Sequence, residues 1–173
     1  MIFVGHIAIA VTAVQISTQF CRYQRRIDLR KIALVSILPD LIDKPLAFCL
    51  PEEFGYHTRL YAHSLLFCVL MIPVFIAARR RLGPPLLYWL TLCSHLVLDQ
   101  MWVAHEVMLF WPLLGEPKPQ RPVAIQIFDR TSFNPDAYAA ELVGLLLLFL
   151  VAVHYRLYRR DKLIALLKTG HLD

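Results

Sequence analysis

Five long apolar runs dominate this sequence and limit what the chain can fold into. They cover residues 2–20, 32–50, 60–78, 85–103 and 137–155. Each run is close to the roughly 20 residues that a helix needs to cross the hydrocarbon core of a bilayer. Hydrophobic residues make up 58% of the 173 residues, and the mean hydropathy of +0.54 is too high for an ordinary soluble domain. We therefore predict an all-α polytopic membrane bundle of about five transmembrane helices, with residues 1–173 forming one domain.

The basic residues lie between the apolar runs, in the pattern that the positive-inside rule describes. They gather after the first run, after the third run and in the C-terminal tail, and all three segments fall on one side of the predicted membrane. The rule makes that side cytoplasmic, so we predict an N-out, C-in topology in a bacterial inner membrane. The formal net charge of +5 then needs no nucleic-acid partner. The residues are Arg22, Arg25, Arg26, Arg30 and Lys31; Arg79, Arg80 and Arg81; and Arg156, Arg159, Arg160, Lys162 and Lys168.

The longest connection, residues 105–136, is rich in proline. Proline lacks a backbone N–H and interrupts helices, so a continuous helix is not expected there. We predict a Pro-rich extracytoplasmic connection or lid. The prolines are Pro112, Pro117, Pro119, Pro122 and Pro135.

The four cysteines lie within the apolar runs or at their ends. No pair has the C-x-x-C spacing of a thiolate metal site or redox motif. We therefore interpret them as small apolar packing residues. They are Cys21, Cys49, Cys68 and Cys93.

Ionisable side chains inside the apolar runs are the feature most informative about function. An unpaired charge in hydrocarbon costs several kcal/mol, so such residues need a compensating role. Asp40 and Asp43 are three residues apart, and His95 and Asp99 are four apart, so each pair shares one helix face. With the helical rise of about 1.5 Å per residue, both pairs and two more histidines fall in one layer near the outer membrane surface. The layer consists of His6, Asp40, Asp43, His63, His95 and Asp99.

Histidines and carboxylates around one volume form a ligand set that suits Zn²⁺ or Mn²⁺ and does not suit thiophilic metals. We predict one or two divalent ions, with zinc preferred, and assign Asp43, with Asp40 as the alternative, to orienting or deprotonating a water molecule. Each histidine could instead be a hydrogen-bonded packing residue, and an Asp–His pair could be a structural contact between helices. The predicted metal ligands are His6, Asp40, His63, His95 and Asp99.

Four short motifs follow His6 in a recognisable order: "PDLID" (39–43), "RLYAHS" (59–64), "SHLVLD" (94–99) and "FWPL" (110–113). This order resembles the family of inner-membrane metal-dependent hydrolases, also described as LexA-binding membrane proteins. The resemblance implies site roles for residues of the second motif, His63 and Ser64. In that family a histidine directly precedes the arginine of this motif; here Thr58 holds the position and His57 lies one residue earlier, as an additional candidate.

A fainter similarity links residues 95–105 to the zinc-dependent phospholipases C. His95, Asp99 and His105 reproduce the spacing of a His-x-x-x-Asp motif with a histidine six residues further on. The similarity implies that His105 is an additional site candidate. The further His-x-x-x-Glu ligands of those enzymes have no counterpart here, so we expect one or two ions rather than a three-metal cluster.

These features together favour a membrane-embedded, metal-dependent hydrolase. We predict that it cleaves a phosphoester of a phospholipid or another amphiphile at the outer leaflet, with its site toward the periplasm and membrane lipids as its surroundings. Arg59 offers a planar fork for phosphate recognition and is the second predicted catalytic residue. Its alternative role is that of an interfacial arginine that extends toward the membrane surface.

Two alternatives from other functional classes remain open. A metal or proton transporter would also contain intramembrane histidines and aspartates, but its path would need ionisable residues in the other halves of the spans, where there are almost none. A non-catalytic membrane adaptor would bind a cytoplasmic partner through its basic connections, as the LexA-binding description suggests. The sequence does not identify a protein partner.

Overall fold

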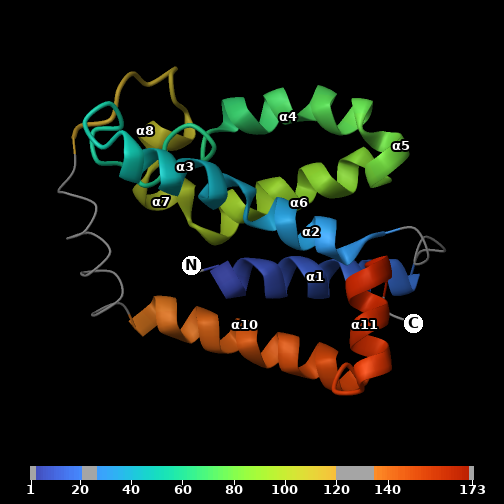
Figure 1. The fold of residues 1–173 in the computed structure, drawn as a ribbon. Helices are drawn as coiled ribbons and strands as arrows, with labels where there is room; N and C mark the ends of the chain where they lie inside the picture. The colour runs from blue at the N-terminus through green and yellow to red at the C-terminus, as the bar shows by residue number, and fades with distance from the viewer. Residues whose placement is uncertain (1–2, 21–26, 120–134, 172–173) are drawn as a thin grey trace.

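The computed structural model describes residues 3–20, 27–119 and 135–171 (Figure 1). Within these ranges the chain forms helices and no strand. In chain order the helices are α1 (Phe3–Phe20), α2 (Leu29–Ser36), α3 (Leu38–Cys49), α4 (Leu65–Ala77), α5 (Arg79–Leu82), α6 (Pro85–Leu98), α7 (Met101–Ala104), α8 (Glu106–Leu109), α10 (Pro135–His154) and α11 (Arg160–Thr169).

The prediction of a polytopic membrane bundle is wrong. Among the described residues, no helix combines the length and the apolar character that crossing a membrane requires. The predicted N-out, C-in topology depends on the same spans and is corrected with them. For the second, third and fourth runs, the reason lies in helix breaks that a count of apolar residues does not detect.

The second apolar run is broken in the middle. α2 ends at Ser36 and α3 begins at Leu38, which divides the run into helices of 8 and 12 residues. Pro39 lies in the first turn of α3. Proline is favoured at such a position because its missing N–H would have no helical partner there, whereas it would interrupt one continuous helix.

The third and fourth runs form helices that are shorter than the runs themselves. α4 has 13 residues because it begins only after Ser64, whose hydroxyl oxygen caps the helix by accepting a hydrogen bond from the Phe67 N–H. α6 has 14 residues and is followed by Gln100 in the left-handed conformation, with φ of 53°. Helices of this length extend roughly 20 Å, whereas the hydrocarbon core is roughly 30 Å thick.

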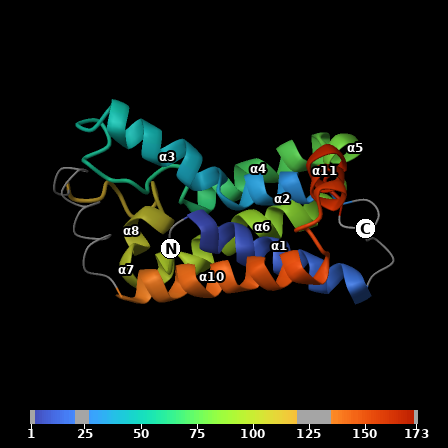
Figure 2. The same cartoon turned by 60° about the horizontal axis from the view of Figure 1, so that its bottom comes forward.

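The two longest helices, α1 with 18 residues and α10 with 20, contain polar side chains. α1 includes His6 and Gln15, and α10 includes Glu141. The two helices lie side by side and run parallel in both views (Figures 1 and 2). Their backbones are in close contact, because a Cβ atom added to Gly144 would lie 2.8 Å from the Gly5 Cα atom.

The remaining helices pack on the other side of α1. α2 contacts both α1 and α6, and α4 contacts α6, so that α4 and α6 form an antiparallel pair (Figure 1). The main hydrophobic core runs along these four helices and includes Ile32, Tyr88 and Leu92, all fully buried. A smaller core of Ala47, Phe54 and Leu60 lies beyond the C-terminal half of α3.

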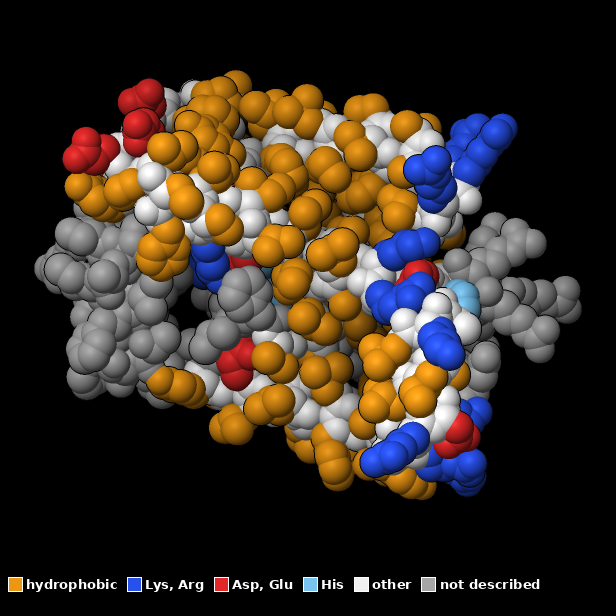
Figure 3. Space-filling model, viewed as in Figure 1, with side chains coloured by type: hydrophobic (Ala, Val, Ile, Leu, Met, Phe, Trp, Pro, Cys, Tyr) orange, Lys and Arg blue, Asp and Glu red, His pale blue; other side chains and the backbone are white. Residues whose placement is uncertain are grey.

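α11 packs at the end of the bundle that lies away from α3 (Figure 1). The Leu29 N–H donates a hydrogen bond of 2.8 Å to the Gly170 carbonyl, and the Arg30 guanidinium donates to the Leu167 and Lys168 carbonyls. Lys and Arg side chains gather at this end of the molecule, while hydrophobic side chains cover most of the face in view (Figure 3). The basic segments that the sequence analysis grouped together therefore lie near one another where they are described.

The predicted Pro-rich connection, residues 105–136, falls partly outside the described residues. Its described portion contains α8 and continues to residue 119. Its role as an extracytoplasmic connection or lid, and the assignment of residues 1–173 to one domain, stay predictions.

Candidate metal centre

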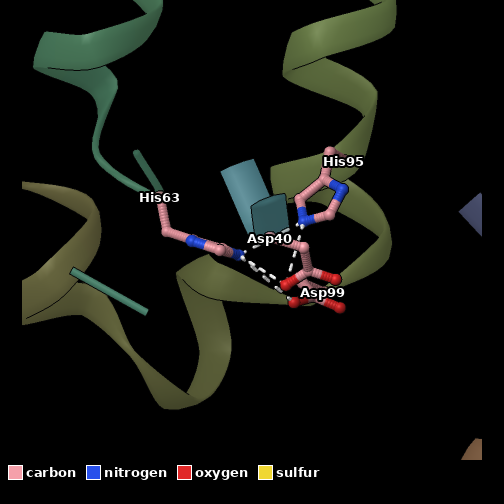
Figure 4. Close-up of side chains that lie close together, drawn as sticks. All are labelled: Asp40, His63, His95 and Asp99. Carbon is pink, nitrogen blue, oxygen red and sulfur yellow. Dashed lines mark hydrogen bonds and ion pairs between the residues drawn. The ribbon is translucent and has the colours of Figure 1, made fainter. Parts of the chain in front are cut away.

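Four buried side chains meet where α3 begins and α6 ends. Asp40, His63, His95 and Asp99 each offer a ligand atom, and these atoms all lie within 4.8 Å of one another (Figure 4). Asp40 lies in the first turn of α3, His63 in the segment before α4, His95 in the last turn of α6, and Asp99 directly after α6. Three separate stretches of the chain therefore build one polar centre.

The two histidine rings face each other through their Nε2 atoms, which are 3.2 Å apart. Each ring is oriented through its Nδ1 atom: that of His95 lies 2.7 Å from the Ser36 carbonyl oxygen, and that of His63 lies 2.8 Å from the Asp43 Oδ2 atom. A carbonyl and an ionised carboxylate only accept hydrogen bonds, so both Nδ1 atoms carry the hydrogen and the Nε2 atoms face each other with lone pairs. A cation between them, either a proton or a metal ion, removes the resulting repulsion.

The carboxylates add to this preference for a cation. Oδ1 of Asp40 lies 3.5 Å from His63 Nε2 and 3.9 Å from His95 Nε2, and it accepts no hydrogen bond from the described residues. Oδ2 of Asp99 lies 3.8 Å from His63 Nε2. A buried carboxylate oxygen without a donor is costly, and coordination of a metal ion would satisfy it. The residues present therefore fit a divalent ion.

The break between α2 and α3 makes the orientation of His95 possible. The last four carbonyls of a helix have no partner within that helix and must find one elsewhere. Ser36 is the last residue of α2, and its carbonyl accepts the hydrogen bond from His95. The helix end just before Pro39 thus supplies a fixed acceptor for a histidine of the candidate metal centre.

Asp43 organises the segment that contains His63. Its carboxylate accepts hydrogen bonds from the Leu60 N–H (2.7 Å), the Ala62 N–H (3.0 Å) and the His63 ring. Buried N–H groups of an irregular segment need acceptors, and Asp43 provides them. Asp43 lies one turn after Asp40 on the same buried face of α3, so one helix face supplies both a ligand and the group that positions another ligand.

Two basic side chains balance the carboxylates. The Arg59 Nε donates a hydrogen bond to Asp99, and the Lys44 Nζ donates one of 2.7 Å to Asp40. Arg59 is nearly as buried as its partner, with a side chain 7% exposed, whereas the Lys44 side chain is 28% exposed. Lys44 therefore connects the buried centre to the surface.

The surroundings favour ionised carboxylates and a neutral His95. Burial alone would raise the pKa of Asp99, but the contact with His6 and the charge of Arg59 outweigh it and hold this pKa well below its usual range. Burial is likewise outweighed at Asp40, where the contact with His63 and the charge of Lys44 lower the pKa. Burial and the neighbouring rings of His6 and His63 lower the pKa of His95 to about 3.

The pKa of His63 changes in the opposite direction. Burial would lower it, but the nearby Asp40 carboxylate and the hydrogen bond to Asp43 outweigh burial and raise the pKa above its ordinary value. His63 therefore attracts a positive charge, and a metal ion would have to displace a proton from it when the ring is protonated.

His6, a predicted ligand, borders the group of four but is not one of its members. Its Nε2 atom lies 3.2 Å from Asp99 Oδ1, and its ring stacks on that of His95 with the centroids 3.9 Å apart. The side chain is fully buried. Its role as a ligand stays a prediction.

The three additional candidates lie outside the group of four. His57 is buried next to Gly55, close to the backbone of Pro117 and Lys118. Ser64 caps α4, and His105 lies half-buried at the junction of α7 and α8. Ser64 thus has a structural contact that explains its presence without a metal.

Sequence reasoning missed two contributors to the centre. Lys44 could have been found, because it lies four residues after Asp40, the spacing at which oppositely charged residues pair on a helix. The Ser36 carbonyl could not have been found in this way, since it contacts a residue 59 positions away and a backbone atom has no sequence signature.

Together, the fold and the site define a helical protein with a buried centre of histidine and aspartate that can hold a metal ion. Residues 1–161 match the family described as YdjM inner membrane protein, and the chain therefore belongs to this family. The match agrees with the family resemblance of the motifs and supports the predicted location at the inner membrane; the name of the family specifies no hydrolase activity. No curated protein and no solved structure matches the chain.

Proposed function

We propose that the protein is a metal-dependent hydrolase that cleaves a phosphoester of a phospholipid or another amphiphile at the inner membrane. The observation that carries this proposal is the pair of inward-facing Nε2 atoms, 3.2 Å apart, next to an Asp40 oxygen without a hydrogen-bond donor. A site toward the periplasmic side is part of the proposal.

The ligand set favours zinc, with manganese as the second choice. Two imidazole nitrogens and two carboxylate oxygens are ligands that Zn²⁺ accepts readily, and no thiol belongs to the group. One ion would be held by Asp40, His63, His95 and Asp99. A second ion would have to recruit His6, which already contacts Asp99.

The side chains around the ligands are suited to an anionic substrate. When bound, the metal ion supplies Lewis-acid activation of a phosphoryl group. Arg59 and Lys44 place two positive charges beside the ligands and favour binding of a phosphate. Asp43 was predicted to orient or deprotonate a water molecule; its hydrogen bonds to the 60–63 segment favour a positioning role for it.

The surface of α3 supports an amphiphilic substrate. Asp40 and Asp43 lie on the buried face of this helix, whereas Leu41 and Phe48 are 49% and 56% exposed on its outer face. Exposed apolar side chains continue across much of the face in Figure 3. An apolar chain could therefore lie against the protein while its phosphate reaches the polar centre.

The test is metal content and hydrolysis in the same preparations. Detergent-purified protein loaded with Zn²⁺ would be analysed for bound metal and assayed with bis(p-nitrophenyl) phosphate and with phospholipid vesicles. We expect about one bound ion per chain and hydrolysis of at least one substrate. His95→Ala should lose both the ion and the activity.

The matched control is His154→Ala, which removes an exposed histidine at the C-terminus of α10. This variant should keep the metal content and the activity of the unsubstituted protein. Absence of metal after loading with Zn²⁺ or Mn²⁺, or full activity in His95→Ala, would contradict the proposal. Stoichiometric metal without hydrolysis of either substrate would retain the metal centre and reject the phosphoesterase.

A further inference from the structure

Two cysteine side chains meet in the interface between α4 and α6. Cys68 belongs to the main hydrophobic core and is 1% exposed, and Cys93 packs against the same core while remaining partly exposed. The two thiols influence each other: the neighbouring Cys93 thiol raises the pKa of Cys68, and the Cys68 thiol lowers the pKa of Cys93. Their separation of 25 positions in the sequence is the reason why spacing alone gave no indication of a pair.

A second contact fixes the alignment of the two helices at this point. The Trp89 Nε1–H donates a hydrogen bond of 3.0 Å to the Cys68 carbonyl. Trp89 and Cys93 are four residues apart and therefore lie on one face of α6. Because this face meets Cys68 through two different groups, the approach of the thiols follows from the packing of the helices and not from one rotamer.

We propose that Cys68 and Cys93 form a redox-convertible thiol pair, which a disulfide-containing oxidant converts to an intramolecular disulfide between α4 and α6. The partly exposed Cys93 is the entry point for the oxidant, and the buried Cys68 completes the reaction. The proposal does not depend on the hydrolase activity, since it concerns the two thiols and their interface alone.

The reaction balances as two thiol–disulfide exchanges. The Cys93 sulfur loses its proton and attacks the oxidant's disulfide, which forms a mixed disulfide and releases one thiol. The Cys68 sulfur then loses its proton and attacks the Cys93 sulfur, which breaks the mixed bond and releases the second thiol. The two cysteines lose two electrons and two protons, and the oxidant's disulfide takes up both to become two thiols.

The pair lies close to the metal centre along both helices. Cys93 precedes His95 by two residues, and Cys68 follows His63 by five, beyond the Ser64 cap. A disulfide would tie together the two chain segments that contribute the paired histidines. Oxidation would thereby limit how far His63 and His95 can separate.

The experiment uses the full chain with Cys21→Ser and Cys49→Ser, so that Cys68 and Cys93 are the two remaining cysteines. The folded protein is treated with oxidised glutathione, unfolded, alkylated with N-ethylmaleimide and analysed by intact mass and peptide mapping. We expect the loss of two hydrogen atoms, no alkylation, a peptide that joins both cysteines, and reversal by dithiothreitol. The same mapping on the unsubstituted protein covers the case in which the two serine substitutions impair folding.

The matched control restores Cys49 and replaces Cys68 by serine. Cys49 is exposed at the end of α3, so this chain also has two cysteines but lacks the pair at the interface. It should form no intramolecular disulfide. Two free thiols in the test protein after oxidation, a persistent glutathione adduct on Cys93, or disulfides only between chains would each overturn the proposal.

Discussion

The ion pairs at the two ends of the helical bundle differ in their exposure to solvent. At the metal-centre end, the ion pair of Arg59 and Asp99 is almost completely buried, with side chains 7% and 0% exposed. At the other end, the side chains of Arg159 and Asp161 are 53% and 60% exposed, although two hydrogen bonds of 3.2 and 3.1 Å join them. The same types of side chain therefore work in two very different environments.

The difference shows at which end of the bundle buried charges lower the stability of the fold. An exposed ion pair contributes little, because water solvates each partner almost as well alone. A buried pair must first lose its hydration, at a cost of several kcal/mol per ion, and recovers this only through good geometry and further hydrogen bonds. Concentrated burial of Asp40, Asp43, Arg59 and Asp99 at one end thus indicates a site with a purpose other than folding.

The largest contrast should come from removing the cation of each pair. Arg59→Met leaves the buried Asp99 carboxylate without its guanidinium and should lower the free energy of unfolding by about 3 to 5 kcal/mol. Arg159→Met should leave that free energy nearly unchanged. Urea unfolding in the presence of a chelator measures both, and equal small effects would show that the two ends do not differ as described.

A smaller effect is expected for a residue that positions a ligand. Asp43→Asn keeps the shape of the side chain but removes the charge that orients His63, and should weaken zinc binding by about 10- to 100-fold. Competition with a chromogenic chelator measures the affinity. Asp161→Asn is the matched control with unchanged affinity, and a loss of affinity in both variants would mean that net charge, and not orientation, is responsible.

Substitutions of Ser64 should change the stability of the protein without changing its affinity for zinc. Ser64→Ala removes the cap of α4 and should lower the free energy of unfolding by about 1 kcal/mol, while zinc affinity stays the same. Ser64→Thr retains a capping hydroxyl and should recover most of the loss. Weaker zinc binding at unchanged stability would instead assign Ser64 to the metal centre.

The smallest effect concerns His57, which is buried outside the metal centre. Burial lowers its pKa in the folded protein, so below a pH of about 6.5 the unfolded chain binds a proton that the folded chain does not. Stability should therefore fall as the pH drops through this region, and His57→Phe should make the decline shallower by less than about 1.4 kcal/mol per pH unit. Identical pH profiles of the unfolding free energy would contradict the assignment.

Local spacing carried much of the information about the candidate site. The i, i+3 relation of Asp40 and Asp43 and the i, i+4 relation of His95 and Asp99 indicated shared helix faces, and the structure places all four at one end of the bundle. Both relations are local, so they can be inferred from an isolated helix.

The positions of the helix ends could not be inferred from hydropathy. An apolar run looks the same whether it is one helix or two, and the transmembrane prediction failed at Pro39, at the Ser64 cap and at the left-handed Gln100. Long-range contacts were equally inaccessible, since the Ser36 carbonyl and the Cys68 thiol meet their partners through tertiary packing.

The two paired histidines differ in the kind of group that orients them. The ring of His95 is oriented by a peptide carbonyl at the end of α2, whereas the ring of His63 is oriented by the side chain of Asp43, which also accepts hydrogen bonds from the Leu60 and Ala62 amides. A substitution of Asp43 therefore loosens one histidine and its chain segment together, whereas no side-chain substitution at Ser36 removes the backbone acceptor of His95. The half of the centre that is built on α2 and α6 should thus tolerate more sequence variation at its orienting residue than the half that depends on Asp43.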